Sequence, residues 1–210
     1  MFHYATVSPR LLSLGALVVL AFSTGEAVAT QNADARIVLH AQPANAQNGC
    51  VTPQQSLGLN CDSVRPTVNV SASQVIDVYV YLHSYDSVAG AQMAFTWPAS
   101  WTFQYWVGGC QAHEMLAVAT PQASGDSYIG AFDVITGGLL QPLGRLRFTT
   151  GTSGSQFTVT ETWAPGGTGI VNSQQEFAVI PSNHRGVIAV GSSGVDSCGG
   201  KSDSSALFEE

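Results

Sequence analysis

The sequence predicts an all-β protein: a single antiparallel β-sandwich of jelly-roll type that follows an N-terminal signal peptide. About nine or ten short segments are rich in β-branched and aromatic residues, and Gly, Pro, Ser or Asn bounds each of them. After the leader, no stretch carries the sustained i, i+3, i+4, i+7 apolar pattern of a long helix. The 210 residues fit one domain rather than two.

Residues 1–29 have the features of a secretory signal peptide. Arg10 precedes a 12-residue apolar run at residues 11–22, which as a helix would span about 18 Å and is too short for a hydrocarbon core of about 30 Å. Residues 27–29 (Ala-Val-Ala) then place small side chains at a cleavage site. We therefore expect a secreted protein, extracellular, cell-surface or periplasmic, whose mature chain begins at Thr30 and has no membrane span. The alternative is an N-terminal membrane anchor.

All four cysteines lie in the part expected to be exported: Cys50, Cys61, Cys110 and Cys198. An even number in an oxidising compartment indicates two disulfides, and three pairings are possible. We favour Cys50–Cys61, which closes a short polar loop, and Cys110–Cys198, which ties the C-terminal end to the middle of the domain. Cys110 and His113 have ligand-like spacing, but no second pair stands at zinc-site spacing, so no metal site is predicted.

Residues 30–66 are expected to form an N-terminal strand and a disulfide loop. Residues 36–41 (RIVLHA) are expected to form a short strand. Residues 42–65 are polar and contain Pro and Gly, which indicates a loop. The sandwich domain is expected at residues 67–191, and it opens with a strand-like segment at residues 67–71.

The clearest strand covers residues 75–84. Its apolar face consists of Ile76, Val78, Val80 and Leu82. Its other face consists of Asp77, Tyr79, Tyr81 and His83. This period of two is typical of a strand with one buried face. Strands at residues 88–97 and 101–107 follow, and Pro98 ends the first of them because proline cannot continue a ladder.

The second half of the domain repeats this style. The expected strands are residues 115–120, 127–134, 145–150, 157–161, 176–180 and 186–190. After Gly191 the composition shifts to Ser, Gly and Asp, so residues 192–210 are expected to form a flexible C-terminal tail.

The order of these segments resembles that of the cohesin-like β-sandwich, over residues 67–190. The resemblance rests on VIDVYVYLHS, VAGAQMAFTWP, SYIGAFDV, LGRLRFTTG with its edge of Gly144, Leu146 and Phe148, and the final VIAVG. It implies a non-catalytic module: cohesins dock calcium-binding dockerins through one sheet face, and carbohydrate-binding relatives present aromatic residues to glycans. The cysteines and the loop between Cys50 and Cys61 depart from the family pattern.

Composition and motifs exclude several functions. A net charge of -7 is the wrong sign for nucleic-acid binding, which needs a basic surface. The hydrolase elbow, the phosphate-binding loop, the dinucleotide fingerprint and the calcium loop are all missing, and His113-Glu114 lacks the second histidine of a zinc protease. Asp133 and Glu161 lie on separate expected strands, and no pattern pairs them for glycoside hydrolysis. We therefore expect no catalytic residue and no cofactor.

Aromatic residues are the best candidates for ligand contact, because a flat exposed ring offers a large contact area to a sugar. Trp97 and Trp101 are expected in the core. Trp106 faces outward if Trp101 and Tyr105 face the core, because neighbouring side chains alternate along a strand. Trp163 lies in an expected loop before Pro and Gly. Tyr79 and Tyr81 form a second platform, or are covered by a neighbouring segment.

The sequence thus predicts a secreted, non-catalytic binding or adhesion module for an extracellular or cell-surface polysaccharide. The alternative within binding is cohesin-like docking of a secreted or surface protein across a flat sheet face. A structural surface protein that self-associates and a secreted hydrolase are the readings from other classes.

Overall fold

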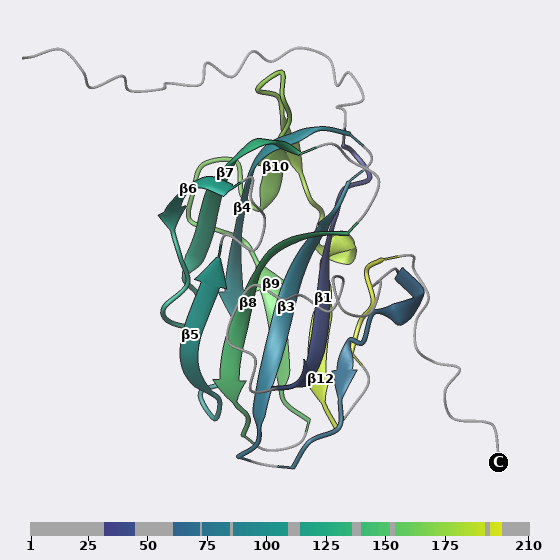
Figure 1. Cartoon of the computed structure of the whole chain (residues 1–210), viewed down its shortest axis with the longest axis vertical. Coiled ribbons are helices and arrows are strands. Elements are labelled where there is room, and N and C mark those ends of the chain that lie inside the picture. Colours follow the sequence, from purple (N-terminus) through teal and green to yellow (C-terminus); the bar gives the residue numbers. More distant parts are fainter. Residues whose placement is uncertain are drawn as a thin grey trace, which may run out of the picture.

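The computed structural model describes residues 32–44, 61–71, 73–84, 86–108, 114–135, 140–151, 154–191 and 194–198 (Figure 1). The predicted signal peptide, Cys50, Cys110 and residues 199–210 lie outside the described residues. Within them, no helix is long and apolar enough to cross a membrane.

Twelve strands and two short 3-10 helices make up the described part of the chain. The strands are β1 (Arg36–Pro43), β2 (Thr67–Val68), β3 (Val75–His83), β4 (Val88–Thr96), β5 (Thr102–Gly108), β6 (Glu114–Ala119), β7 (Ser127–Ile135), β8 (Leu140–Thr149), β9 (Gln156–Thr160), β10 (Gly169–Val171), β11 (Phe177–Val179) and β12 (Val187–Val190). The helices are η1 (Cys61–Ser63) and η2 (Ser182–His184). Gly-, Pro- and Ser-rich turns connect short strands throughout, so the predicted all-β class is confirmed.

The strands form two layers, which Figure 1 shows one behind the other. The front sheet has the order β1-β3-β8-β5. The second has the order β11-β10-β4-β9-β12-β2, and β7, with β6 at its far side, pairs with the other edge of β4. All pairs are antiparallel except β2 with β12, which run parallel. This is the predicted β-sandwich.

The core fills the space between the two sheets. Ile76, Val78, Val80 and Leu82 are all buried there, so the apolar face predicted for β3 is confirmed. An aromatic group spans both layers: the ring of Trp97 lies 5.1 Å from that of Phe148 and 6.2 Å from that of Phe157. Aromatic pairs at such separations add about 0.5–1.5 kcal/mol to the burial of their surface.

Of the differences from the predicted strands, the longer β8 and the additional β10 are the largest. β8 begins at Leu140 and includes Pro142, whereas a strand was expected only from residue 145. Proline is tolerated there because the pairing with β3 shifts by one residue at this point, between Val80 and Tyr81. β10 was not expected, since three residues are too few to show a period.

The sandwich begins earlier and ends later than the boundaries at residues 67 and 191. β1 pairs with β3 over its whole length, from Arg36 opposite His83 to Pro43 opposite Ile76. Beyond β12, the hydroxyl of Ser197 donates to the carbonyl of Ile37 at 2.6 Å. Residues 194–198 are therefore attached to the domain, although they were assigned to the tail.

The disulfide pairing was predicted wrongly. Cys61 is bonded to Cys198, with Cα atoms 5.3 Å apart. The reason is that the chain around each cysteine lies against β1: the backbone N–H of Arg65 donates to His40 Nδ1, and the guanidinium of Arg36 donates to the carbonyl of Ser197. This bond excludes both Cys50–Cys61 and Cys110–Cys198.

Candidate functional site

The outer surface of the second sheet carries two rows of uncharged, mainly apolar residues that cross five strands in the order β6-β7-β4-β10-β11. The first row is Leu116, Ala131, Gly90, Val171 and Phe177. The second row is Ala119, Ile129, Gln92, Gly169 and Val179. The row between them points inward, since Ala91, Ile170 and Ala178 belong to the core and side chains alternate along a strand.

We call these ten residues the apolar face. None of them is charged, and Gln92 is the only polar one. Leu116 is 58% exposed at one end and Val179 is 54% exposed at the other, four strand spacings or about 19 Å away. Contiguous apolar surface is uncommon on a soluble monomer and marks interaction sites.

Two buried glycines, Gly90 and Gly169, occupy the centre of the apolar face. A Cβ on Gly169 would lie 2.5 Å from the Phe177 ring, so this ring rests directly on the backbone of β10. A Cβ on Gly90 would lie 3.1 Å from the carbonyl oxygen of Gly130 in β7. The Phe177 ring therefore covers the backbone of β10 at the centre of the apolar face.

A loop carrying Trp163 adjoins the apolar face. The side-chain amide of Gln92 donates to the carbonyls of Pro165 at 2.9 Å and Gly167 at 2.6 Å. Gly166 and Gly167 have φ values of +91° and +75°, a left-handed conformation that favours glycine. These contacts hold the loop beside the middle of the sheet.

The base of this loop is closed by hydrogen bonds. The backbone N–H of Thr168 donates to Glu161 Oε2 at 2.8 Å, and the hydroxyl of Thr168 donates to the carbonyl of Thr160 at 2.6 Å. The buried guanidinium of Arg185 contacts Glu161 Oε1 at 2.6 Å. The Thr168 N–H and then Arg185 lower the pKa of Glu161, so this carboxylate stays ionised and bonded at neutral pH.

The buried neighbours of Trp163 fix its backbone while its side chain remains exposed to solvent. Thr162 and Ala164 on either side are buried, and the hydroxyl of Thr162 is within 2.6 Å of that of Ser127. Trp163 itself is 75% exposed. Trp163 thus lies in a loop, as predicted from the sequence, and its ring is exposed.

Trp106, by contrast, was predicted to face outward and instead packs against the core. Its ring lies 5.3 Å from that of Tyr128 and close to the backbone of Gly144. The pairing of β5 with β8 shifts between Phe103 and Tyr105, and this bulge puts both Phe103 and Trp106 against the core. Trp106 is therefore not available as a flat surface platform.

Tyr79 and Tyr81 lie on the outer face of the front sheet but are covered. They are 2% and 0% exposed, and they pack with Val64 and Cys198, which lie outside the sheet. Burial raises the pKa of Tyr79. Of the two alternatives from the sequence, coverage by neighbouring segments is the correct one.

Beside these tyrosines is a buried ion cluster. Arg147 donates two hydrogen bonds of 2.7 Å to the carboxylate of Asp77, and Arg145 Nη1 lies 3.5 Å from Asp77 Oδ2. The guanidinium groups of Arg145 and Arg147 also lie over the Tyr105 ring, at 5.9 and 5.3 Å from its centroid respectively. Because Asp77 is fully buried, this cluster is a structural feature of the front sheet rather than a surface for solutes.

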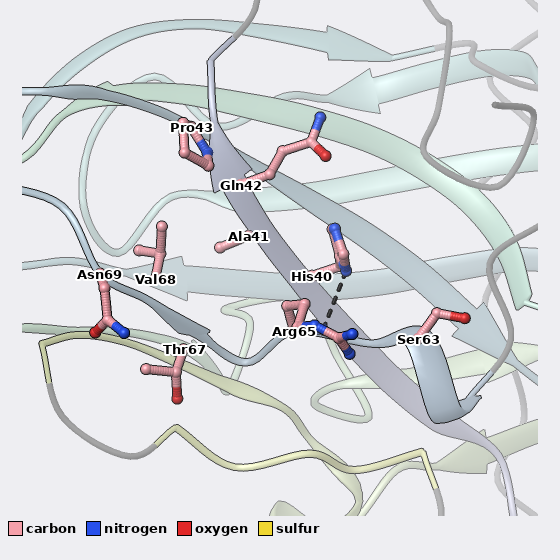
Figure 2. Close-up of a pocket in the computed structure, with 9 residues that line it drawn as sticks. All are labelled: His40, Ala41, Gln42, Pro43, Ser63, Arg65, Thr67, Val68 and Asn69. Atoms are coloured by element: carbon pink, nitrogen blue, oxygen red, sulfur yellow. Dashed lines mark hydrogen bonds between the residues drawn. The ribbon is translucent and has the colours of Figure 1, made fainter. Parts of the chain in front are cut away.

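A pocket of about 360 Å³ opens between β1 and the chain at residues 63–69 (Figure 2). Its polar side chains are those of His40, Gln42, Ser63, Arg65, Thr67 and Asn69. Burial, and then Arg65, lower the pKa of His40 to about 4, so the ring is neutral at pH 7. Since Nδ1 already accepts the Arg65 N–H at 3.1 Å, the ring is not placed to act as a general base on a substrate.

The comparisons with known proteins concern the fold. No protein-family model matches the chain, and no curated protein matches it in sequence. Solved structures similar to it include the cohesin module of a family 33 glycoside hydrolase from Clostridium perfringens, with 10% identity, a TM-score of 0.44, and 73% of this chain and 96% of that chain covered.

Two further matches are also cohesins. The type III cohesin of a cell-surface anchoring scaffoldin from Ruminococcus flavefaciens has 10% identity and a TM-score of 0.43, with 75% of this chain and 88% of that chain covered. A non-cellulosomal cohesin from Archaeoglobus fulgidus has 17% identity and a TM-score of 0.39, with 60% and 85% covered. All three of these solved structures are cohesin modules.

Proposed function

We propose that this chain is a secreted, non-catalytic binding module that docks a partner protein through the apolar face. The observation that supports this most directly is the register of five strands, which aligns ten residues without a single charge. Burying the exposed side chains of Leu116 and Val179 against a partner would stabilise the complex by about 25 cal/mol for each Å² of apolar surface removed from water.

The charges around the apolar face indicate the chemistry of the partner. Asp133 and Glu176 are exposed at its margin, on β7 and just before β11. The arginines of the described part lie elsewhere: Arg36, Arg65, Arg145 and Arg147 are on or beside the front sheet, and Arg185 is paired with Glu161. We therefore propose a partner whose own surface has an apolar centre with basic residues around it.

The test compares substitutions on and off the apolar face. Partners retained from the source organism's secretome are identified, purified and titrated against the variants. Leu116→Asp and Val179→Asp are each expected to weaken binding about 30-fold, the loss of about 2 kcal/mol seen when an interface anchor is removed. Val195→Asp is the matched control, because Val195 is 50% exposed but lies beside β12, away from the apolar face. A partner that binds all three variants equally well would overturn the proposal.

A polysaccharide is the second candidate ligand, supported by the exposure of Trp163. Stacking of a sugar ring on this indole predicts that Trp163→Ala loses retention on a polysaccharide, while Leu116→Asp and Val179→Asp retain it. A panel of soluble and insoluble polysaccharides tests this directly. If Trp163→Ala migrates as the unchanged protein does on every member of the panel, the glycan reading is wrong.

Secretion is tested at the N-terminus. We expect the exported form to begin at Thr30, because the small residues at positions 27–29 direct cleavage there. N-terminal sequencing of protein recovered from the medium or cell surface checks this. An exported protein that retains residues 1–29 would indicate an anchor instead.

A further inference from the structure

The disulfide between Cys61 and Cys198 has a histidine beside it. The ligand atoms of Cys61, Cys198 and His83 all lie within 4.8 Å of one another. They come from three separate places in the fold: η1, the end of β3 and the segment after β12. The three residues share no short spacing, so no sequence motif predicts this group.

These three side chains match the ligand preferences of a thiophilic divalent metal. Zinc binds thiolate sulfur at about 2.3 Å and imidazole nitrogen at about 2.0–2.1 Å, usually with tetrahedral geometry. In that geometry, neighbouring ligand atoms lie about 3.5–3.8 Å apart. To reach this geometry, the two sulfurs must move apart once they are no longer bonded to each other, while the histidine nitrogen already lies within 4.8 Å of both.

The surroundings of the group favour thiolate ligands. Cys198 is 4% exposed and packs with Val38, Val64, Tyr79, Tyr81 and Leu140. Arg36 is directly opposite His83 in the β1–β3 register, and its guanidinium is held by the carbonyl of Ser197, next to Cys198. A nearby guanidinium stabilises the thiolate form of a cysteine, which offsets the opposing effect of apolar burial, and the apolar shell limits the access of competing ligands from water.

We infer that, when its Cys61–Cys198 disulfide is reduced, this protein binds one Zn²⁺ through the sulfurs of Cys61 and Cys198 and a ring nitrogen of His83. A small dithiol or a phosphine supplies the two electrons that break the S–S bond, and two protons complete the two thiols. Metal binding then releases these two protons, while neutral His83 contributes a lone pair. Water fills the fourth position, as in other sites with three protein ligands.

The test uses the full chain with Cys50→Ser and Cys110→Ser, so that only the two cysteines of the site remain. The protein is reduced with a phosphine and titrated with Co²⁺, whose thiolate charge-transfer and tetrahedral visible bands report the ligands directly. We expect one Co²⁺ per chain, displaced by one Zn²⁺, and no bands from the oxidised protein. His83→Ala is expected to weaken Zn²⁺ binding at least about tenfold, the minimum effect of disturbing a metal site.

Two further variants separate metal ligation from a general effect on folding. His184→Ala is the control, since His184 lies in η2 and contacts the carbonyl of Ala35; it should bind Co²⁺ as the parent does. His83→Cys supplies a third thiolate and should restore binding with stronger charge-transfer absorption. The inference is overturned if the reduced parent shows no thiolate bands, or if the spectrum and affinity are unchanged in both His83 variants.

Discussion

Acidification should destabilise this protein through His40, a residue buried at 3% exposure in β1. Its Nδ1 accepts the backbone N–H of Arg65 at 3.1 Å, and its ring stands 6.2 Å from that of Tyr79. Protonation of Nδ1 would turn this acceptor into a donor facing another donor. The perturbation is therefore a change of pH, and the matched variant is His40→Asn, whose side-chain oxygen can accept the same N–H but does not titrate.

The magnitude follows from the pKa of His40, which burial and Arg65 lower from 6.5 to about 4. Between these two values the unfolded chain binds a proton that the folded chain does not, so the free energy of unfolding falls as the pH falls. The slope is about 1.4 kcal/mol per pH unit, which gives a loss of about 3 kcal/mol over the whole interval. Above pH 6.5 this contribution is fully present and constant, and below pH 4 no more of it is lost.

Urea unfolding at a series of pH values from 7.5 to 4 measures this effect. The unchanged protein should lose about 3 kcal/mol more stability over this range than His40→Asn, because titration of the carboxylates and of His83 is common to both proteins. Parallel stability curves for the two proteins would refute the reasoning, since His40 would then titrate alike in the folded and unfolded chains.

Three other substitutions test the packing. Asp77→Asn should cost about 3–5 kcal/mol in urea unfolding, because it leaves two buried arginines without their carboxylate; a loss below 1 kcal/mol would contradict this. Gly144→Ala should cost about 1–3 kcal/mol, since the new Cβ would lie 2.3 Å from the Trp106 ring, and an unchanged melting temperature would show that the ring moves freely. Mapping of unreduced peptides should recover Cys61 linked to Cys198, and replacing both by Ser should cost about 5 kcal/mol, from the closure of a loop with a sequence separation of 137; any other partner for Cys61 would contradict the fold.

The strands were predictable because the local alternation of polar and apolar residues depends on which face of each strand is buried. In β3, the alternation of Ile76, Val78, Val80 and Leu82 with polar residues set both the strand and its inward face. The alternation does not indicate which chain segments cover the outer face of the front sheet. It left Tyr79 and Asp77 on a nominally open face, and the chain around Cys61 and Cys198 covers part of that face.

The candidate site was less predictable because it depends on pairing. The loop position of Trp163 was predictable from the Pro and Gly that follow it. The outward position predicted for Trp106 is wrong because the β5–β8 pairing contains a bulge, which has no signature in the local sequence. The apolar face was not predictable from the sequence for a similar reason. Leu116, Ala131, Val171 and Phe177 come from four strands, and only their register places them in one row.

The bond between Cys61 and Cys198 also decides how the domain would respond to tension. A force applied to the chain at residue 198 is transmitted through the disulfide to residue 61. The strands between these two residues, up to β12, do not carry that force. The segment between the two cysteines, with a sequence separation of 137, cannot be extended while the disulfide is intact. The disulfide therefore shortens the fully extended length of the chain by about 470 Å. The tension instead falls on β1 and its pairing with β3. In a single-molecule force measurement, the oxidised protein should therefore show only a short increase in extension on unfolding, and the reduced protein should show the long one.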